Sequence, residues 1–597
     1  MAIRVNRLLS ELNIGLSALN DFLNALGYKE PNLSPNTKLP DEVEILVRSL
    51  TQEDVDFLKL IATAAERGLY GSLNSDVPGL KIVGHIDLDS LGEPIRRKDK
   101  RNTVRSQGEQ LPPVYGEKPK FWISDLAILS SQNTADILHV GSFDEAGNQP
   151  LFSVLIGTNG AGKSTMMKEI VDFFVDLHSC MNETEKRLSS VNKGRLKGIR
   201  YHIDGVICEV IRLKKSYFAR INGQIQPLKE LRLPAIVACH FGAFDKFPTQ
   251  KVNGSAQTKY DVACYKYVGA HVNGSMISSS AIAFRLLFAL NEQMNEKQRE
   301  NICSILDFIG YDHRISLSYT LVMKSKKDGA ALDAIKQRVD KDREYSNLDK
   351  QERSAKVSQL YNFYKTKTVS GASQLVYDID FDSGDDGSSF EDLQYIYKLK
   401  QCDLVSSVNV IFHKQGNDIT SEDMSSGEFA MLSTVLSLSA AATNPHTLVL
   451  LDEPELSLHP NWQMTLIDNL DRALFKQNCH LLIATHSHML VSDLPMKRSS
   501  VTQLEKDEAG RLTSTTITES TYGWSAEEVL LKVFKTATDR NRYFGERIGT
   551  LLKKMGNNTI SPKEVRSELK ELQEISMHLS DIDPMKTILN IIVETYK

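Results

Sequence analysis

The chain has 597 residues, enough for about two to four domains and at least one large hydrophobic core. Its 71 lysines and arginines nearly balance 76 aspartates and glutamates, which excludes a globally basic nucleic-acid-binding composition but not a local basic groove. The 7 cysteines are dispersed without a C-x-x-C pair, which argues for reduced thiols and against a disulfide framework or a zinc site. Because neither a secretory segment nor a long apolar run is present, we expect a cytoplasmic protein without a membrane span.

Residues 1–70 are predicted to form a small all-helical module. Leucine and valine side chains recur at helical spacing on two successive faces, and a third helix is expected to begin at Asp41. The residues on the two faces are Val5, Leu8, Leu9, Leu12, Leu16, Leu19, Leu23 and Leu26. Such a module can bind nucleic acid or simply pack on a neighbouring domain, and the pattern leaves both interpretations open.

Residues 71–120 carry a run of cations from Arg96 to Arg105, followed by several prolines. A charged, proline-bearing stretch with few apolar residues is typical of a linker. The same cations have the right chemistry to contact a phosphate backbone, so the two roles are compatible.

The stretch GTNGAGKST, residues 157–165, follows an apolar run at 151–156 and precedes helical apolar spacing at 166–177. Strand, glycine-rich loop and helix in this order predict a Walker A P-loop, whose backbone N–H groups turn toward a phosphate at a helix N-terminus. The lysine can reach the β- and γ-phosphates, and the Ser164 hydroxyl is placed to ligate Mg²⁺. The predicted nucleotide-binding residues are Gly157, Thr158, Asn159, Gly160, Ala161, Gly162, Lys163, Ser164 and Thr165.

Downstream of the P-loop, residues 199–238 read as strands with a break at Asn222-Gly223, and a mostly helical insertion is expected from about residue 276. Within that insertion, the charged residues 334–367 are predicted to form a short helical hairpin. Strands at 375–381 and 405–413 are expected to lead back into the α/β core.

A second apolar strand, residues 447–451, ends in Asp452-Glu453-Pro454. Two carboxylates at the end of a buried strand are the Walker B arrangement: the first can hold Mg²⁺ opposite Ser164, and the second can orient or deprotonate the attacking water. A further strand, 479–484, ends before His486, which can hydrogen-bond a γ-phosphate. The predicted catalytic residues are therefore Glu453 and His486, and the predicted metal ligands are Ser164 and Asp452.

Met424-Ser425-Ser426-Gly427-Glu428 opens a helical apolar pattern. Serine and glycine at a helix start leave N–H donors exposed to an anion. These residues precede the Walker B strand at the separation of an ABC-type signature, so Ser425, Ser426 and Gly427 complete the predicted nucleotide-binding set.

Together, GTNGAGKST, MSSGE, LVLLDEPELSLHP and IATHS resemble an ABC-type ATPase of the SMC and DNA-repair branch of the AAA family. Over residues 120–535 the chain is similar to bacterial defence ATPases, namely the overcoming-lysogenization-defect group and the ATPase subunit of Septu-type and retron-associated systems. ACHFGAFDKFP and TYGWSAEEVLLKVF also resemble the Septu-type group. The N-terminal module resembles the helical module of bacterial translation initiation factor 2.

This resemblance implies that ATP and Mg²⁺ are the cofactors and that two heads dimerise head to tail, as a homodimer or a higher even oligomer. Ser425 and Gly427 of one head would touch the γ-phosphate held by Lys163 of the other, and Asn159 would help to sense closure. One departure is that the strand ending at Cys239 is followed by His240 where the family usually has a Q-loop glutamine. With Asp245 nearby, the residue that senses Mg²⁺ and water stays unassigned.

Proteins of the overcoming-lysogenization-defect group carry a nuclease effector domain in the same chain. A C-terminal Toprim nuclease is not expected here, because Asp581-Ile582-Asp583 lacks the apolar strand that its D-x-D motif needs. The expected function is therefore an ATP-hydrolysing sensor of a bacterial antiphage complex that controls a separate, HNH-type nuclease. The alternatives are a DNA-clamping repair ATPase, for which nucleic acid would be the partner, and a ribosome-associated ABC factor.

The expected fold class is α/β, an ABC-type ATPase head with a mixed sheet, a helical insertion, a small all-α N-terminal module and a helical C-terminal tail. The predicted domains are the helical N-terminal module (1–70), the linker (71–120), the ATPase lobe with the P-loop (121–275), the helical insertion (276–370), the ATPase lobe with the signature, Walker B and histidine switch (371–520) and the helical tail (521–597).

Overall fold

The computed structural model describes most of the chain after Lys120 and scattered positions before residue 48. The described residues are 3–12, 16, 19–20, 23, 34–39, 47, 119–129, 135–143, 149–157, 160–182, 194–213, 217–240, 245–249, 259–260, 262–269, 296–322, 329–341, 348–369, 374–382, 388–420, 423–442, 444, 446–456, 458–506, 512–517, 519–534, 542–557, 561–578 and 584–595. The predicted linker up to residue 118, with its cationic run, lies outside these residues. Within them, no helix combines the length and apolar composition that a membrane crossing requires.

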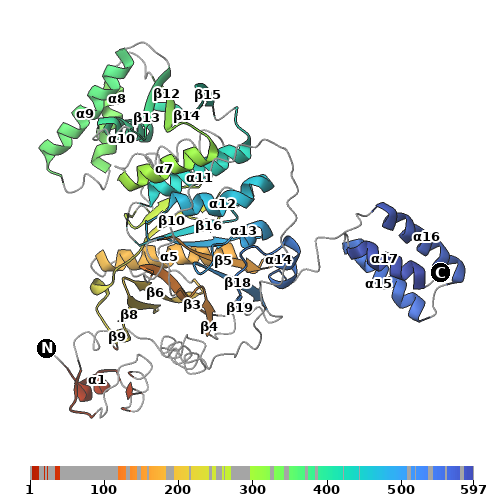
Figure 1. The fold of residues 1–597 in the computed structure, drawn as a ribbon. Coiled ribbons are helices and arrows are strands. Elements are labelled where there is room, and N and C mark those ends of the chain that lie inside the picture. Colours follow the sequence, from red (N-terminus) through yellow and green to blue (C-terminus); the bar gives the residue numbers. More distant parts are fainter. Residues whose placement is uncertain are drawn as a thin grey trace, which may run out of the picture. The chain divides into compact units, whose positions relative to one another are not determined.

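A seven-stranded sheet carries the predicted motifs (Figure 1). In spatial order its strands are β11 (Tyr265–Tyr267), β10 (Ala235–His240), β16 (Thr447–Asp452), β17 (His480–Ala484), β5 (Leu151–Gly157), β18 (Ser499–Lys506) and β19 (Leu512–Ile517). All neighbours pair in parallel except β18 and β19. The central strands are continuous apolar runs because both faces of a parallel sheet are covered.

A second sheet of six antiparallel strands faces the P-loop helix α5 (Lys163–Asn182). Its strands, in spatial order, are β4 (Ala135–His139), β3 (Phe121–Leu129), β6 (Leu196–Ile203), β7 (Val206–Arg212), β8 (Tyr217–Ile221) and β9 (Gln224–Ile225). Phe173 of α5 meets Tyr217 edge-to-face at 5.4 Å, and one hydrophobic core joins α5 to both sheets. The predicted break at Asn222-Gly223 is confirmed as a hairpin turn, with positive φ at both residues.

Helices α11 (Ser426–Ala441), α12 (Pro460–Ala473) and α7 (Glu296–Ile309) cover the opposite face of the seven-stranded sheet, and the short α13 (His488–Ser492) follows β17 (Figure 1). Together with α5 on the other face, they complete a layered α/β head. The expected ABC-type α/β fold class is confirmed.

The segment beyond α7 forms a small α+β part with a four-stranded antiparallel sheet. Its elements in chain order are β12 (Arg314–Leu321), α8 (Gly329–Lys341), α9 (Lys350–Val369), β13 (Gln374–Asp380), α10 (Ser388–Gln401), β14 (Val405–Lys414) and β15 (Asn417–Thr420). Helices α8 and α9 pack on each other, which confirms the predicted helical hairpin. The strands predicted at 375–381 and 405–413 exist, but they pair with β12 in this separate sheet rather than entering the core.

The described part of the N-terminal module contains α1 (Val5–Leu12) and one antiparallel pairing, between β1 (Ile3–Arg4) and β2 (Lys38–Leu39). The module is therefore not purely helical. Leu8, Leu19 and Leu23 are buried in one cluster with Ala127 and Phe218 of the six-stranded sheet. The predicted apolar faces thus pack on a neighbouring sheet.

Residues 525–597 form a second compact unit, separate from residues 1–524. Its helices are α14 (Ala526–Lys532), α15 (Arg542–Gly556), α16 (Pro562–His578) and α17 (Pro584–Thr595). Ile548, Leu572 and Leu589 from three of these helices share a hydrophobic cluster of their own. The predicted helical tail is confirmed as a small helical unit.

Candidate nucleotide site

The P-loop lies between the end of β5 and the start of α5. Gly160 and Gly162 have φ values of +82° and +101°, a region that glycine adopts without the Cβ clash of other residues. At Gly157 a Cβ atom would lie 2.3 Å from the backbone oxygen of Leu504 in β18, so only glycine fits. Thr158 and Asn159 lie outside the described residues.

Lys163 is 5% exposed and points back over the loop. Its Nζ atom donates hydrogen bonds to the Gly157 carbonyl at 2.9 Å and to Nε2 of His486 at 2.7 Å. Burial lowers the pKa of Lys163, and the negative charges of Glu453, Asp452 and Glu455 oppose that shift without cancelling it. The ammonium group thus sits at the point where three predicted motifs meet.

Asp452 ends β16 and is almost fully buried. Burial raises the pKa of this carboxyl to about 6, and a hydrogen bond with the Ser164 side chain only partly offsets that shift. Its Oδ1 atom has no hydrogen-bond partner among the described residues. A buried carboxylate oxygen without a partner is costly, so a ligand at this atom would relieve a desolvation penalty.

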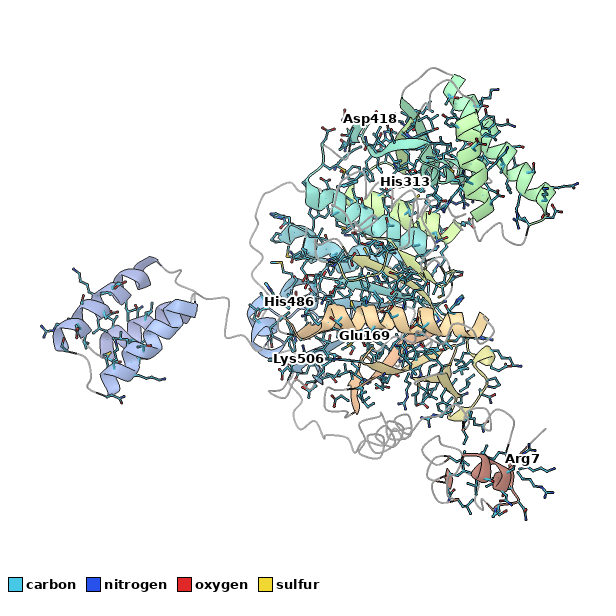
Figure 2. The ribbon with its side chains drawn as sticks, turned by 180° about the vertical axis from the view of Figure 1, so that it is seen from behind. Arg7, Glu169, His313, Asp418, His486 and Lys506 are labelled. Carbon is cyan, nitrogen blue, oxygen red and sulfur yellow. The ribbon has the colours of Figure 1, made fainter. Side chains whose placement is uncertain are left out.

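Glu453 follows with φ of +48°, a left-handed conformation that costs a non-glycine residue about 1 kcal/mol or more. The Glu453 N–H donates to the Ala484 carbonyl of β17 at 2.8 Å, which holds this turn. As a result the carboxylate is 29% exposed, and its Oε1 lies 3.9 Å from Nε2 of His486. Figure 2 labels His486 beside the seven-stranded sheet.

The ring of His486 is 34% exposed. Burial, and then the positive charge of Lys163, lower the pKa of His486, while Glu453 acts in the opposite direction. The resulting neutral ring is the form that can accept the hydrogen bond from the lysine.

Glu455 is a functional candidate that the sequence analysis missed. Its Oε1 atom accepts a hydrogen bond from the His486 backbone N–H at 2.7 Å, and Oε2 is buried without a partner among the described residues. Burial raises the pKa of Glu455 despite that bond. The residue lies in DEPE, two positions beyond the predicted catalytic carboxylate.

The signature residues begin α11. Ser425 is exposed and caps the helix, since its Oγ accepts a hydrogen bond from the Glu428 N–H at 3.2 Å. The Glu428 carboxylate in turn accepts a hydrogen bond from the Tyr311 hydroxyl at 2.6 Å. Among the described contacts, none joins Ser425 or Gly427 to the P-loop of the same chain, and the side chain of Ser426 is not described. Among the described residues, the signature is thus separated from the P-loop of its own chain, unlike Asp452, Glu453 and His486.

Residues 142–491, more than half of the chain, match the AAA ATPase domain family (AAA_15). The chain belongs to the AAA ATPase domain family. Its activity is therefore ATP hydrolysis, and the converging motifs described above all lie within the matched residues of this AAA ATPase.

Several solved structures of Smc heads are similar to this AAA ATPase at low identity. The Smc head bound to the C-winged helix domain of ScpA is 12% identical, with 66% of this chain and 98% of that chain covered and a TM-score of 0.27. The Smc head with an extended coiled coil bound to the C-terminal domain of ScpA, from Pyrococcus furiosus, is 11% identical over 66% and 96% of the chains, with a TM-score of 0.27. The Smc head with a coiled coil and joint from Pyrococcus yayanosii is 10% identical over 70% and 99%, with a TM-score of 0.28.

A divalent cation fits the residues of this AAA ATPase. The Ser164 hydroxyl, in the first turn of α5, is hydrogen-bonded to the Asp452 carboxylate. The Oδ1 atom of Asp452 has no partner among the described residues and can accept a ligand. Hydroxyl and carboxylate oxygens are the donors that Mg²⁺ prefers, and the ion normally keeps waters and nucleotide phosphates as its other ligands. When bound, the ion would neutralise phosphate charge as the terminal phosphate is transferred.

His240, at the position of the expected Q-loop glutamine, lies directly beside Asp452. The two residues are paired in the β10–β16 ladder, and His240 Nδ1 is 2.6 Å from the Asp452 carbonyl oxygen. The Nδ1 atom must therefore carry the proton and donate. The ring is buried, its Nδ1 also lies 3.9 Å from Asp452 Oδ2, and Nε2 has no hydrogen-bond partner among the described residues.

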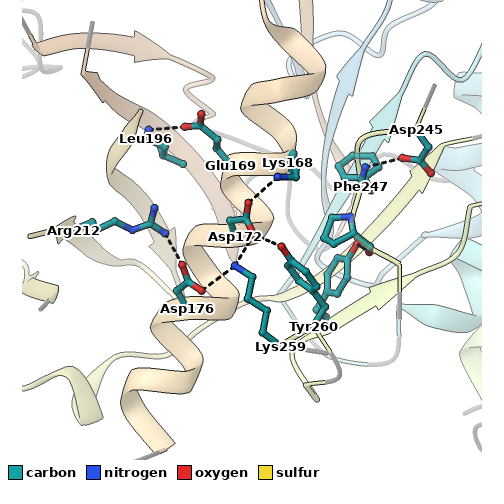
Figure 3. A network of polar contacts seen from close by, with 12 residues as sticks. Lys168, Glu169, Asp172, Asp176, Leu196, Arg212, Asp245, Phe247, Lys259 and Tyr260 are labelled. Carbon is teal, nitrogen blue, oxygen red and sulfur yellow. Dashed lines mark hydrogen bonds and ion pairs between the residues drawn. The ribbon is translucent and has the colours of Figure 1, made fainter. Parts of the chain in front are cut away.

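The segment after β10 is tied to α5 (Figure 3). Lys246 donates to the Thr165 hydroxyl at 3.1 Å, and Asp172 accepts hydrogen bonds from Lys259 at 2.9 Å and from Tyr260 at 2.7 Å. Asp245 accepts from the Phe247 N–H at 2.7 Å, which shapes the turn. These bonds fasten the segment after β10 to helix α5.

His240→Gln is expected to keep most ATPase activity, whereas His240→Ala is expected to reduce it by about 10-fold to 100-fold, the usual cost of losing a partner of a metal ligand. Glutamine can still donate a hydrogen bond to the Asp452 carbonyl, and alanine cannot. Steady-state phosphate release measures both variants. His446→Ala is the matched control, because His446 precedes β16 at the end opposite Asp452 and pairs with Asp204. Wild-type activity in His240→Ala would contradict this role.

A cavity of about 290 Å³ is lined in part by the P-loop residues Ala161, Gly162 and Thr165. Its walls include Leu129 of β3, Met166 of α5 and Leu512 of β19, with Glu169 and Lys506 at polar positions. Lys506 donates to the Gly160 carbonyl at 2.6 Å, and Figure 2 labels Glu169 and Lys506 on this side of the head. Charged and polar side chains, those of Asp136, Thr165, Glu169, Arg195 and Lys506, line this cavity together with the apolar ones.

Proposed function

We propose that this AAA ATPase binds and hydrolyses ATP between two heads that close head to tail. The observation that carries the proposal is the separation of the motifs: Lys163, Asp452, Glu453 and His486 converge, while the exposed Ser425 makes no described contact with them. A second copy that placed its α11 N-terminus over the P-loop would complete the site. Leu456 and Met464, next to the Walker B turn, are 55% and 52% exposed and would be covered by that copy.

Each residue has a role in this scheme. Lys163 and the loop amides bind the phosphates, Ser164 and Asp452 hold Mg²⁺, and Glu453 orients the water and accepts its proton. The water oxygen attacks the γ-phosphorus, the bond to the β–γ bridging oxygen breaks, and ADP leaves with the electron pair. The proton on Lys163 and the N–H donors of the partner's signature helix stabilise the charge that develops.

At the next level, we infer that the ATP state of the dimer regulates a separate nuclease effector in a bacterial antiphage complex. The support is the Septu-like sequence outside the ATPase motifs and the unit formed by residues 525–597, which has its own core. Leu552 and Ile591 on that unit are 36% and 57% exposed, which suits a docking surface for a second protein.

Co-purification tests this assignment. The tagged full-length protein is isolated from its native host with Mg²⁺ and ATP, and the bound molecules are identified by mass spectrometry. A stoichiometric nuclease that is lost when residues 525–597 are deleted, together with lower phage resistance of the deletion strain, is the expected result. ATPase activity of the same deletion variant, residues 1–524, is the control that the head still folds. Recovery of DNA alone would support a DNA-clamping ATPase, and recovery of ribosomal proteins would support a ribosome-associated factor.

A further inference from the structure

A cluster of metal-binding side chains lies in the α+β part, away from the nucleotide motifs. Cys303 is on α7, His313 immediately precedes β12, and Asp382 follows β13 by two residues. One ligand atom from each of these three residues lies within 4.8 Å of the other two. Figure 2 labels His313 in this part of the molecule.

We propose that Cys303, His313 and Asp382 bind a zinc ion. His313 Nδ1 lies 2.7 Å from Asp382 Oδ1, and Cys303 Sγ lies 3.7 Å from the same oxygen. Tetrahedral zinc with bonds of about 2.0–2.3 Å separates neighbouring ligand atoms by roughly 3.3–3.7 Å. Small side-chain movements therefore bring Cys303 Sγ, His313 Nδ1 and Asp382 Oδ1 to bonding distance from one zinc ion. The fourth coordination position is left for water.

The donor set selects the metal. One thiol, one imidazole and one carboxylate suit the borderline-soft Zn²⁺, whereas Mg²⁺ and Ca²⁺ prefer oxygen alone. Asp307, 2.9 Å from His313, adds a further carboxylate beside the cluster. A cation would compensate the negative charge that gathers there.

A second carboxylate, that of Asp307, lies beside the other ring nitrogen of His313. His313 Nε2 lies 2.9 Å from Asp307 Oδ1 as an ion-pair contact without hydrogen-bond alignment, whereas Nδ1 is hydrogen-bonded to Asp382 Oδ1 at 2.7 Å. A carboxylate on the far nitrogen of a metal-bound histidine is a common arrangement that fixes the ring and raises its basicity. The backbone supports the same geometry, because the Phe381 N–H donates to the His313 carbonyl at 3.0 Å.

The position of the cluster suggests what the ion does. Tyr311, two residues before His313, donates its hydroxyl hydrogen bond to Glu428 on the signature helix. The neighbouring Asp312 N–H donates to the His413 carbonyl of β14 at 2.8 Å. An ion that joins α7 to the ends of β12 and β13 would brace the corner from which Tyr311 reaches the signature helix. This inference does not depend on the proposed antiphage role.

The competing interpretation is an ion pair without metal, in which a protonated His313 bridges Asp307 and Asp382. Asp307 and Asp382 are 70% and 66% exposed, so solvent and ions both have access. The two interpretations differ in the thiol: an ion pair has no use for Cys303, and a zinc site requires it.

The test is a Co²⁺ and Zn²⁺ titration of the metal-free, nucleotide-free, full-length protein. We expect about one ion per chain with a thiolate-to-cobalt charge-transfer band that Zn²⁺ removes. Cys303→Ser should abolish that band, and Asp307→Asn should weaken zinc affinity by about 10-fold or more. Cys264→Ser, another half-buried free thiol, is the matched control and should keep the band.

Absence of the band, or its persistence in Cys303→Ser, overturns the proposal. Should Cys303→Ser fail to fold, X-ray absorption of the zinc-loaded wild-type protein decides the question. One sulfur ligand among nitrogen and oxygen ligands supports the site, and a shell without sulfur refutes it.

Discussion

Glu453→Gln is expected to bind ATP with near wild-type affinity and to hydrolyse it about 10²-fold to 10⁴-fold more slowly, the usual contribution of a positioned general base. Glutamine keeps the shape of the side chain and leaves the left-handed backbone turn at φ of +48° unchanged. It removes the charge that lies 3.9 Å from His486 and faces solvent. The ATP-bound dimer should therefore accumulate, because closure remains possible and hydrolysis does not reopen it.

Light scattering after size exclusion, with and without Mg²⁺ and ATP, measures the accumulated dimer, and phosphate release measures the rate. Glu528→Gln is the control, because Glu528 is an exposed carboxylate on α14 that pairs only locally with Lys532. If Glu453→Gln hydrolysed ATP at the wild-type rate, the assignment of the catalytic carboxylate would be wrong. A monomer in saturating ATP would contradict the closed dimer instead.

Much of the nucleotide site could be predicted because its signals are local in the sequence. Each motif follows a continuous apolar strand, and parallel neighbouring strands bring their carboxyl ends to one edge of a sheet. Asp452 is accordingly the register partner of both His240 and Ala484 on the neighbouring strands. Lys163 contacts His486 although 323 positions of sequence separate them. The separate motifs thus converge through sheet order alone.

Other features were missed because they depend on side-chain packing between distant segments. The role of Glu455 follows from its hydrogen bond to the His486 backbone, which no spacing in DEPE reveals. Cys303 and Asp382 are separated by 79 residues, so their approach is set by how α7 meets β13. The expectation from the dispersed cysteines that the chain has no zinc site stays open until the proposed site is tested, because a sequence pattern detects ligands only when they are close in the chain.

The four-stranded sheet illustrates a third limit. Alternating apolar residues at 375–381 and 405–413 indicated strands correctly, but strand periodicity carries no information about the partner strand. Those strands paired with β12, inside the predicted helical insertion, because antiparallel neighbours connected through helices can close a local sheet. Only long-range contacts decide between that sheet and the core.

Lys163→Ala is expected to weaken ATP binding by at least about 100-fold. The buried ammonium group would donate charge-assisted hydrogen bonds to two phosphates, each worth about 1.5–3 kcal/mol, and alanine restores neither. Nucleotide binding should stabilise the wild-type protein by about 2.7 kcal/mol at 100 times Kd, and this shift should vanish in the variant. Lys168→Ala, on the same helix and 39% exposed, is the control and should retain the shift.

The same variant can show whether the signature acts between chains. Ser425→Arg should block the site that α11 completes, so that each variant alone is inactive. In an equimolar mixture, half of the dimers would combine one intact P-loop with the intact signature of the other chain, which should restore about a quarter of wild-type activity if sites act independently. A signature that acted within its own chain would restore none, because each chain then carries one defect in its own site. Restored activity is therefore expected only if Ser425 serves the P-loop of the opposite head.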